Sequence, residues 1–179
     1  MKRGFELRAL ILTSLIAGAE VATTRLLPWL VYYLPSPATP IVRVSLQFLW
    51  YGMAGWLLGP GWAMGGAMAG DLIGAMLNPT GSGTFFPGFT LTAAASGLLF
   101  GFMLHKRKPA WWLALVTVGL YQLAVALPLT ALWSSHIGGP EFMPAVWTAL
   151  PWRAMLILPY TLVLYAVQKA LERPLAKYV

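Results

Sequence analysis

The chain has 179 residues, of which 59% are hydrophobic and only 9% are charged, and its mean hydropathy is +0.70. Soluble domains carry about 25% charged residues, so this composition disfavours a water-soluble globular protein. The sequence contains no cysteine, which excludes disulfides, zinc–thiolate sites and thiol catalysis. The net charge is +7, and the positions of the basic residues along the chain indicate the membrane topology.

The N-terminal stretch resembles a signal peptide, but its apolar run continues past Ala22 without a clear small-residue cleavage site. We therefore expect it to be retained as a first membrane span. The later apolar stretches are also long and do not alternate, which favours helices over a β-barrel. The punctuation by Pro, Gly and charge predicts one all-α integral membrane domain, residues 1–179, with six transmembrane helices. The expected spans are 7–27, 41–58, 62–77, 89–104, 111–133 and 152–170.

The basic residues support this partition because they gather on alternate connections. Cytoplasmic segments of membrane proteins are enriched in Lys and Arg, so both termini and the fourth connection are predicted to be cytoplasmic. The longer connections after spans one, three and five then face outward. Nine of the twelve basic residues lie on the predicted inner side: Lys2, Arg3, Arg8, Lys106, Arg107, Lys108, Lys169, Arg173 and Lys177.

Three arginines lie near the predicted outer ends of spans, at Arg25, Arg43 and Arg153. A charge at the bilayer centre costs about 2.5 to 3.5 kcal/mol on insertion scales, so such residues snorkel, pair with an acid or line a cavity. Guanidinium groups also bind carboxylates bidentately, and three converging arginines would form an outward-facing site for an acidic small molecule. The acids available for structural pairing are Glu20, Asp71 and Glu141.

The third span carries Gly66, Gly70 and Gly74, which recur every four residues and so share one helix face. Such a stripe permits close packing of another helix. Asp71 is adjacent to the stripe, and we expect it to have a partner inside the bundle, such as one of the arginines. A single acid does not make a proton relay.

Small residues also recur at this spacing in the first and fourth spans. Small side chains let helices approach closely in lipid, and packing within the chain is the simplest interpretation on spacing alone. The residues concerned are Ser14, Gly18 and Ala22 with Thr13 and Ala17 alongside, and Ala93, Gly97 and Gly101.

Aromatic residues are dense in the predicted outer connections. Aromatic belts at the membrane interface explain most aromatic residues of the chain, but this group is larger than a belt requires. A flat heteroaromatic ligand would stack on such rings for about 0.5 to 1.5 kcal/mol per ring. The group consists of Trp29, Tyr32, Tyr33, Phe85, Phe86 and Phe89.

Several catalytic motifs are absent from the sequence. There is no GxxxxGK[ST] phosphate-binding loop, so the chain alone does not hydrolyse ATP. No pairing of a nucleophilic Ser with a His on facing spans supports intramembrane proteolysis, and no HExxH or His/Asp cluster supports a metal enzyme. We expect no catalytic residue, no metal and no resident cofactor.

Four blocks together carry a family resemblance: FFPGFTLTAAASG at 85–97, GDLIGAMLNPTG at 70–81, IVRVSLQF at 41–48, and EVATTR ending in Arg25. Their order and spacing are similar to those of the folate-specific substrate-binding subunit, or S component, of energy-coupling factor (ECF) vitamin transporters. The PGFTLTA segment is the most specific part, and the resemblance covers most of the chain.

The resemblance implies a six-helix S-component fold in a prokaryotic plasma membrane. It implies folate or a reduced folate as the transported ligand, with no nucleic acid as a partner. It also implies docking onto a membrane coupling subunit with two ATPase subunits, through Ser14, Gly18 and Ala22 of the first span. The family-like ligand positions are Arg25, Arg43, Phe86, Gly88, Phe89 and Thr90, followed by Asp71 and Arg153.

Two other classes remain open from the sequence. An S component for pantothenate, thiamin or a pyrimidine precursor would share the bundle and the docking surface. A membrane enzyme or a solitary carrier would show turnover or transport without partner ATPases.

Overall fold

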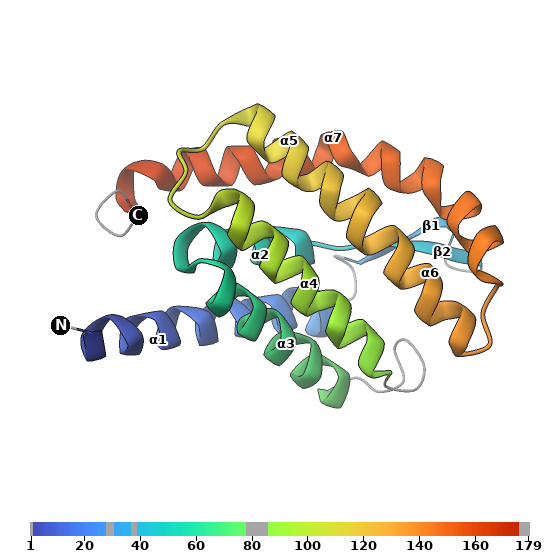
Figure 1. Ribbon diagram of the computed structural model, residues 1–179, viewed down its shortest axis with the longest axis horizontal. Coiled ribbons are helices and arrows are strands. Elements are labelled where there is room, and N and C mark those ends of the chain that lie inside the picture. Colours follow the sequence, from blue (N-terminus) through green and yellow to red (C-terminus); the bar gives the residue numbers. More distant parts are fainter. Residues whose placement is uncertain (1, 28–30, 37–38, 78–85, 176–179) are drawn as a thin grey trace.

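The computed structural model describes residues 2–27, 31–36, 39–77 and 86–175. Within these residues the chain forms six continuous helical rods and one short hairpin (Figure 1). The predicted all-α membrane fold is confirmed. The rods are α1 (Lys2–Val21) with the π-helical turn η1 (Ala22–Leu26), α2 (Gln47–Leu58), α3 (Pro60–Leu77), α4 (Pro87–Leu104), α5 (Trp111–Leu120) continuing through the π-helical segment η3 (Tyr121–Ala126) into α6 (Leu127–His136), and α7 (Phe142–Leu175).

The ends of the bundle agree with the charge pattern. Figure 1 shows the N-terminus, the connection between α4 and α5 and the C-terminal end of α7 at the same end of the molecule. These are the three segments that carry the basic clusters. In the described residues, four helical segments are long and apolar enough to cross a bilayer: Glu6–Arg25, Pro87–Leu104, Trp111–His136 and Phe142–Glu172.

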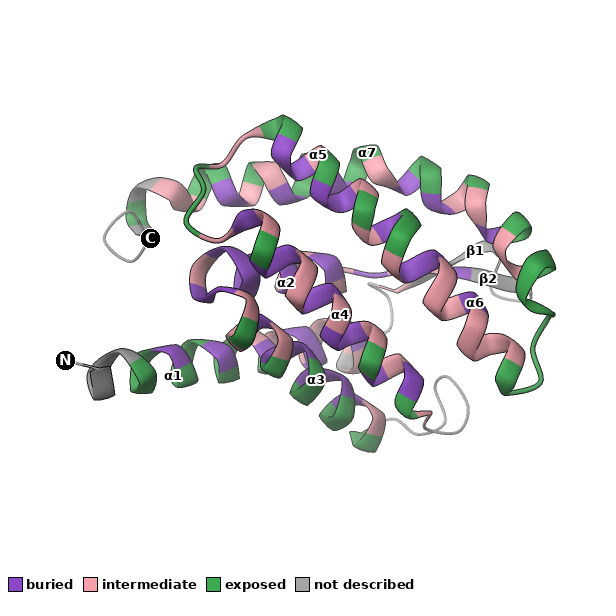
Figure 2. Ribbon diagram, viewed as in Figure 1, coloured by how far each residue is buried: buried purple, intermediate pink, exposed green. Residues whose placement is uncertain are grey.

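Polarity is distributed as in a protein surrounded by lipid. Large apolar side chains are exposed on the outer sides of α1 and α7, among them Leu15 at 64%, Leu158 at 65% and Leu162 at 67% exposure (Figure 2). Charged side chains such as Glu20 and Asp71 are instead buried between the helices. This arrangement fits the multi-pass membrane localisation expected from the sequence.

The second expected span, 41–58, needs a correction. Residues of its first part belong to an antiparallel hairpin of β1 (Tyr32–Ser36) and β2 (Thr39–Val44), in which Tyr33 pairs with Arg43, and the helix begins only at Gln47. A run rich in Pro and β-branched residues favours an extended backbone over a helix. The remaining helix has 12 residues and is about 18 Å long, shorter than the roughly 30 Å hydrocarbon core.

Glycines allow α1, α2, α3 and α4 to pack closely. A Cβ at Gly97 would lie 2.5 Å from the backbone oxygen of Ala63, and a Cβ at Gly66 would lie 2.8 Å from Cγ2 of Thr13. The glycine stripe of α3 therefore serves helix packing, as predicted, and its partner is α1. The sixth rod starts ten residues earlier than the expected position 152, at Phe142.

Candidate functional site

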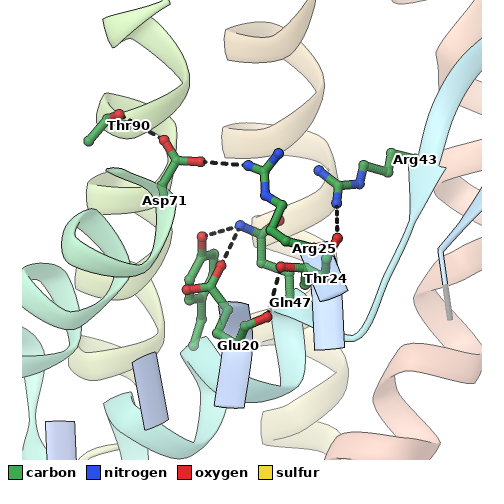
Figure 3. Close-up of polar contacts among 8 residues, drawn as sticks. Glu20, Thr24, Arg25, Arg43, Gln47, Asp71 and Thr90 are labelled. Atoms are coloured by element: carbon green, nitrogen blue, oxygen red, sulfur yellow. Dashed lines mark hydrogen bonds and ion pairs between the residues drawn. The ribbon is translucent and has the colours of Figure 1, made fainter. Parts of the chain in front are cut away.

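Arg25, Asp71 and Thr90 form a buried polar contact that joins three helices (Figure 3). Nη2 of Arg25, from η1, lies 3.5 Å from Oδ1 of Asp71 on α3, and the two side chains are only 11% and 10% exposed. The Thr90 hydroxyl on α4 donates to the other carboxylate oxygen at 2.7 Å. The expected internal partner of Asp71 is thus an arginine, and the charge of Arg25 is compensated within the protein.

The end of the first helix brings Arg43 next to Arg25. The backbone there forms a π-helical turn, in which the amide of Leu27 donates to the carbonyl of Ala22 at 3.1 Å. The last carbonyl groups of a helix lack partners within the helix and carry its negative dipole end. The carbonyl of Thr24 accepts a 2.8 Å hydrogen bond from Nη2 of Arg43, so β2 is held against this helix end.

A second group, around Glu20, was not predicted as a site from the sequence. Glu20 is 3% exposed, and its Oε1 accepts a 2.9 Å hydrogen bond from Nε2 of Gln47 on α2. The same Gln47 amide contacts the hydroxyl of Tyr51. The feature of the sequence that could have indicated this group is a glutamate inside an apolar span. Glu20 and Asp71 place two negative formal charges beside the two positive charges of Arg25 and Arg43, and we call these four residues the paired cluster.

The start of α4 carries an aromatic group. Phe86 lies 5.7 Å from Trp133 of α6 and 6.2 Å from Phe89, measured between ring centroids. Gly88 is required here, because a Cβ would lie 2.5 Å from both Phe86 Cε1 and Trp133 Cδ2. The Trp133 indole also donates to Oγ1 of Thr92 at 2.9 Å, which fixes α6 against α4.

Trp133 is not among the predicted site residues, because it falls at the end of a predicted span and resembles an ordinary belt residue. The remaining members of the predicted aromatic group cannot be placed in this site. Trp29 and Phe85 lie outside the described residues, as do the side chains of Tyr32 and Tyr33.

Arg153 is placed in a different part of the bundle. It is 8% exposed on α7, and its guanidinium donates to Oε1 of Gln122 at 3.1 Å and to Oγ1 of Thr130 at 3.3 Å. Among the described residues no carboxylate lies within 4.0 Å of it, and its Nε has no hydrogen-bond partner. The expected convergence of three arginines therefore holds for Arg25 and Arg43, whereas Arg153 contacts neither of them.

The two small-residue stripes of α1 differ in burial. Thr13 and Ala17 are buried against the bundle, whereas Ser14 and Gly18 are exposed and Ala22 is half-buried. A Cβ at Gly18 would meet nothing within 4 Å. Packing within the chain thus accounts for the inner stripe and leaves Ser14 and Gly18 on the exposed side of the helix.

In the fourth span, by contrast, the stripe is internal, because a Cβ at Gly101 would collide with Pro60. The small residues of α4 therefore serve packing within the bundle, as spacing suggests.

Comparison with known proteins agrees with the fold and with the sequence resemblance. No family model matches the chain. A folate transporter, FolT, of Clostridium novyi (strain NT) is 26% identical over 168 residues, which cover 94% of this chain and 92% of the relative. FolT of Leuconostoc mesenteroides subsp. mesenteroides is 37% identical over 97 residues, which cover 53% and 51%.

A crystal structure of FolT bound with folic acid superposes with a TM-score of 0.78 at 22% identity and covers 91% of this chain and 93% of that one. This chain therefore shares the fold of that protein. The resemblance to folate-specific S components is confirmed by these comparisons.

Proposed function

We propose that this chain is the folate-binding S component of an ECF-type vitamin importer and that it takes up folate or a reduced folate at the outer end of the bundle. The observation that carries the proposal is the paired cluster of Glu20, Arg25, Arg43 and Asp71. Glu20 and Asp71 are buried in the membrane bundle and Arg25 and Arg43 are half-buried, while the opposite end of the bundle carries the basic, cytoplasmic-type segments. Buried ionisable groups in membrane proteins commonly mark ligand pathways.

The chemistry of the proposed site suits the parts of a folate. Its pteridine ring is flat and carries both hydrogen-bond donors and acceptors, and its glutamate end carries two carboxylates. Phe86, Phe89 and Trp133 offer ring faces and edges for stacking. Carboxylate and guanidinium groups of the paired cluster offer acceptors and donors for the ring edge. Gly88 and Thr90 complete the set, the first by permitting the close aromatic contact and the second by holding Asp71.

Delivery of the ligand requires an external energy source in this proposal. The sequence has no phosphate-binding loop, so ATP hydrolysis belongs to two partner ATPase subunits that act through a membrane coupling subunit. The exposed face with Ser14 and Gly18 supports docking there. Small side chains let another helix approach closely in lipid, where the hydrophobic effect contributes little to association.

Purification of the tagged chain from its native membrane tests both parts of the proposal. Mass spectrometry is expected to find a bound folate together with one membrane subunit and two proteins that carry phosphate-binding loops. An unrelated tagged membrane protein from the same membrane is the control. Recovery of pantothenate, thiamin or a pyrimidine precursor instead of folate would contradict the ligand assignment, and folate transport into liposomes by the chain alone would contradict the docking.

A further inference from the structure

Buried arginines occur in two different electrostatic settings in this bundle. Arg25 faces the carboxylate of Asp71 at 3.5 Å, so its charge is neutralised inside the protein. Arg153 is equally buried, but its two hydrogen-bond partners, Gln122 and Thr130, are neutral. In the part of the chain that the structure describes, no acid lies within ion-pair distance of Arg153.

In this setting, several N–H groups of Arg153 have no hydrogen-bond acceptor among the described residues. A guanidinium remains protonated in proteins and has five N–H donors, and within the described residues those of Arg153 meet two acceptors. Its Nε is buried and has no hydrogen-bond partner among the same residues. A buried charge without a counter-charge disfavours the empty folded state, and an anion that reaches it would remove this cost.

The surrounding backbone also distinguishes this position. Gln122 lies in η3, a π-helical segment of six residues within an otherwise regular α5–α6 rod. Such segments are rare and frequent at functional sites. Thr130 and Trp133 lie three residues apart on α6 and therefore on one helix face, so this face of α6 contacts both Arg153 of α7 and Phe86 at the start of α4.

We infer that Arg153, held by Gln122 and Thr130, binds a carboxylate of the ligand's glutamate end, while the paired cluster serves the heterocycle. The inference rests on the proposed function and names which residue carries the ligand's charge. A planar guanidinium suits this role because it binds a carboxylate through two parallel hydrogen bonds. The neutral partners orient the guanidinium and leave its charge for the ligand.

Two ligands separate this role from general damage to the site. Folic acid carries the glutamate carboxylates, whereas 6-hydroxymethylpterin has the heterocycle and no carboxylate. Arg153→Gln is expected to weaken folic acid binding about 10- to 100-fold, the loss typical of a charge-assisted contact, and to leave 6-hydroxymethylpterin binding within about twofold of the unaltered protein. Arg25→Gln, the matched control, is expected to weaken both ligands alike. Equal losses for both ligands in Arg153→Gln would overturn the inference.

A measurement without ligand tests the unpaired charge by itself. Arg153→Met removes an uncompensated charge. We therefore expect its melting temperature in detergent to be equal to or higher than that of the unaltered protein. Arg25→Met is expected to lower the melting temperature, because Asp71 loses its partner. A drop in Arg153→Met as large as that in Arg25→Met would make Arg153 a structural residue. If the unaltered protein bound neither pterin nor folate, the proposed function itself would be contradicted, while the stability contrast would still test the charge.

Discussion

In the half of the bundle formed by α1, α3 and α4, the buried Asp71 has a partner of opposite charge. In the half formed by α5, α6 and α7, a buried arginine has only neutral partners among the described residues. In the first, Asp71 forms an ion pair with Arg25 and accepts a hydrogen bond from Thr90, and glycines of α3 fit against α1 side chains. In the second, Arg153 is buried among neutral partners. The outer face of α1 is open in another sense, because a Cβ at Gly18 would meet no atom of the described residues within 4 Å. In the first half, the charges of the proposed heterocycle site are compensated within the protein, whereas Arg153 and the outer face of α1 are the places where we expect a charged ligand group and a partner protein to bind.

The largest expected effect concerns the exposed face of α1 with Ser14 and Gly18. Gly18→Trp fills open space, so folding and ligand binding are expected to persist while uptake and co-purification with the ATPases are lost. Uptake of labelled folate by cells measures the effect. Leu162→Trp on α7, at a position 67% exposed, is the control and is expected to retain uptake. Normal uptake by Gly18→Trp would show that this face is not the docking surface.

Substitution in the paired cluster is expected to reduce the stability of the fold, whereas Gly18→Trp is expected to leave it unchanged. Asp71→Ala leaves Arg25 buried without an acid and Thr90 without an acceptor, so it should destabilise the protein by about 3 to 5 kcal/mol. Replacing both partners, as Arg25→Met with Asp71→Leu, should recover most of that loss, because no unpaired charge remains. Unfolding in detergent compares the variants. A double variant as unstable as the single one would show that the pair is not the source of the stability.

A smaller effect is expected from helix packing. Gly70→Ala places a Cβ against the Glu20 carboxylate and should cost about 1 to 3 kcal/mol as over-packing. Gly65→Ala on the same helix is the matched control, since its Cβ would meet nothing within 4 Å. It is expected to stabilise by about 0.5 to 1 kcal/mol through helix propensity. The free energies of unfolding of the two variants should therefore change in opposite directions, and equal changes would contradict the packing account.

The smallest expected effect tests a neutral partner of Arg153. Thr130→Val removes the hydroxyl 3.3 Å from the guanidinium and keeps the side-chain shape. The hydroxyl orients Arg153 and does not itself bind the ligand, so we expect a loss of about 0.5 to 1.5 kcal/mol, smaller than that of removing the guanidinium, and folic acid binding should weaken by about 2- to 12-fold. The dissociation constant of 6-hydroxymethylpterin, measured in parallel, should not change. A loss shared by both ligands would place Thr130 at the heterocycle.

Sequence analysis predicted the parts of this arrangement that depend on short-range spacing. Gly66, Gly70 and Gly74 fall on one face of any helix, so the packing stripe and the internal partner of Asp71 follow directly. The ends of the bundle also follow from the sequence, because the basic segments alternate along the chain.

The contacts that were missed depend on tertiary structure. The partners of Arg153 come from helices 23 and 31 residues away, and no local pattern pairs them. The two stripes of α1 have the same period, so spacing alone does not distinguish the buried Ala17 from the exposed Gly18. The hairpin ending at Val44 was included in a span, because an apolar run of this length fits either a strand or the first turns of a helix.

Isothermal titration of the purified protein decides whether this chain binds folate. We expect saturable binding of folic acid and 5-formyltetrahydrofolate with one ligand per chain, tighter than micromolar and unaffected by pantothenate or thiamin. Absence of binding to both folates at micromolar concentration, or displacement of folic acid by pantothenate or thiamin, would contradict this expectation.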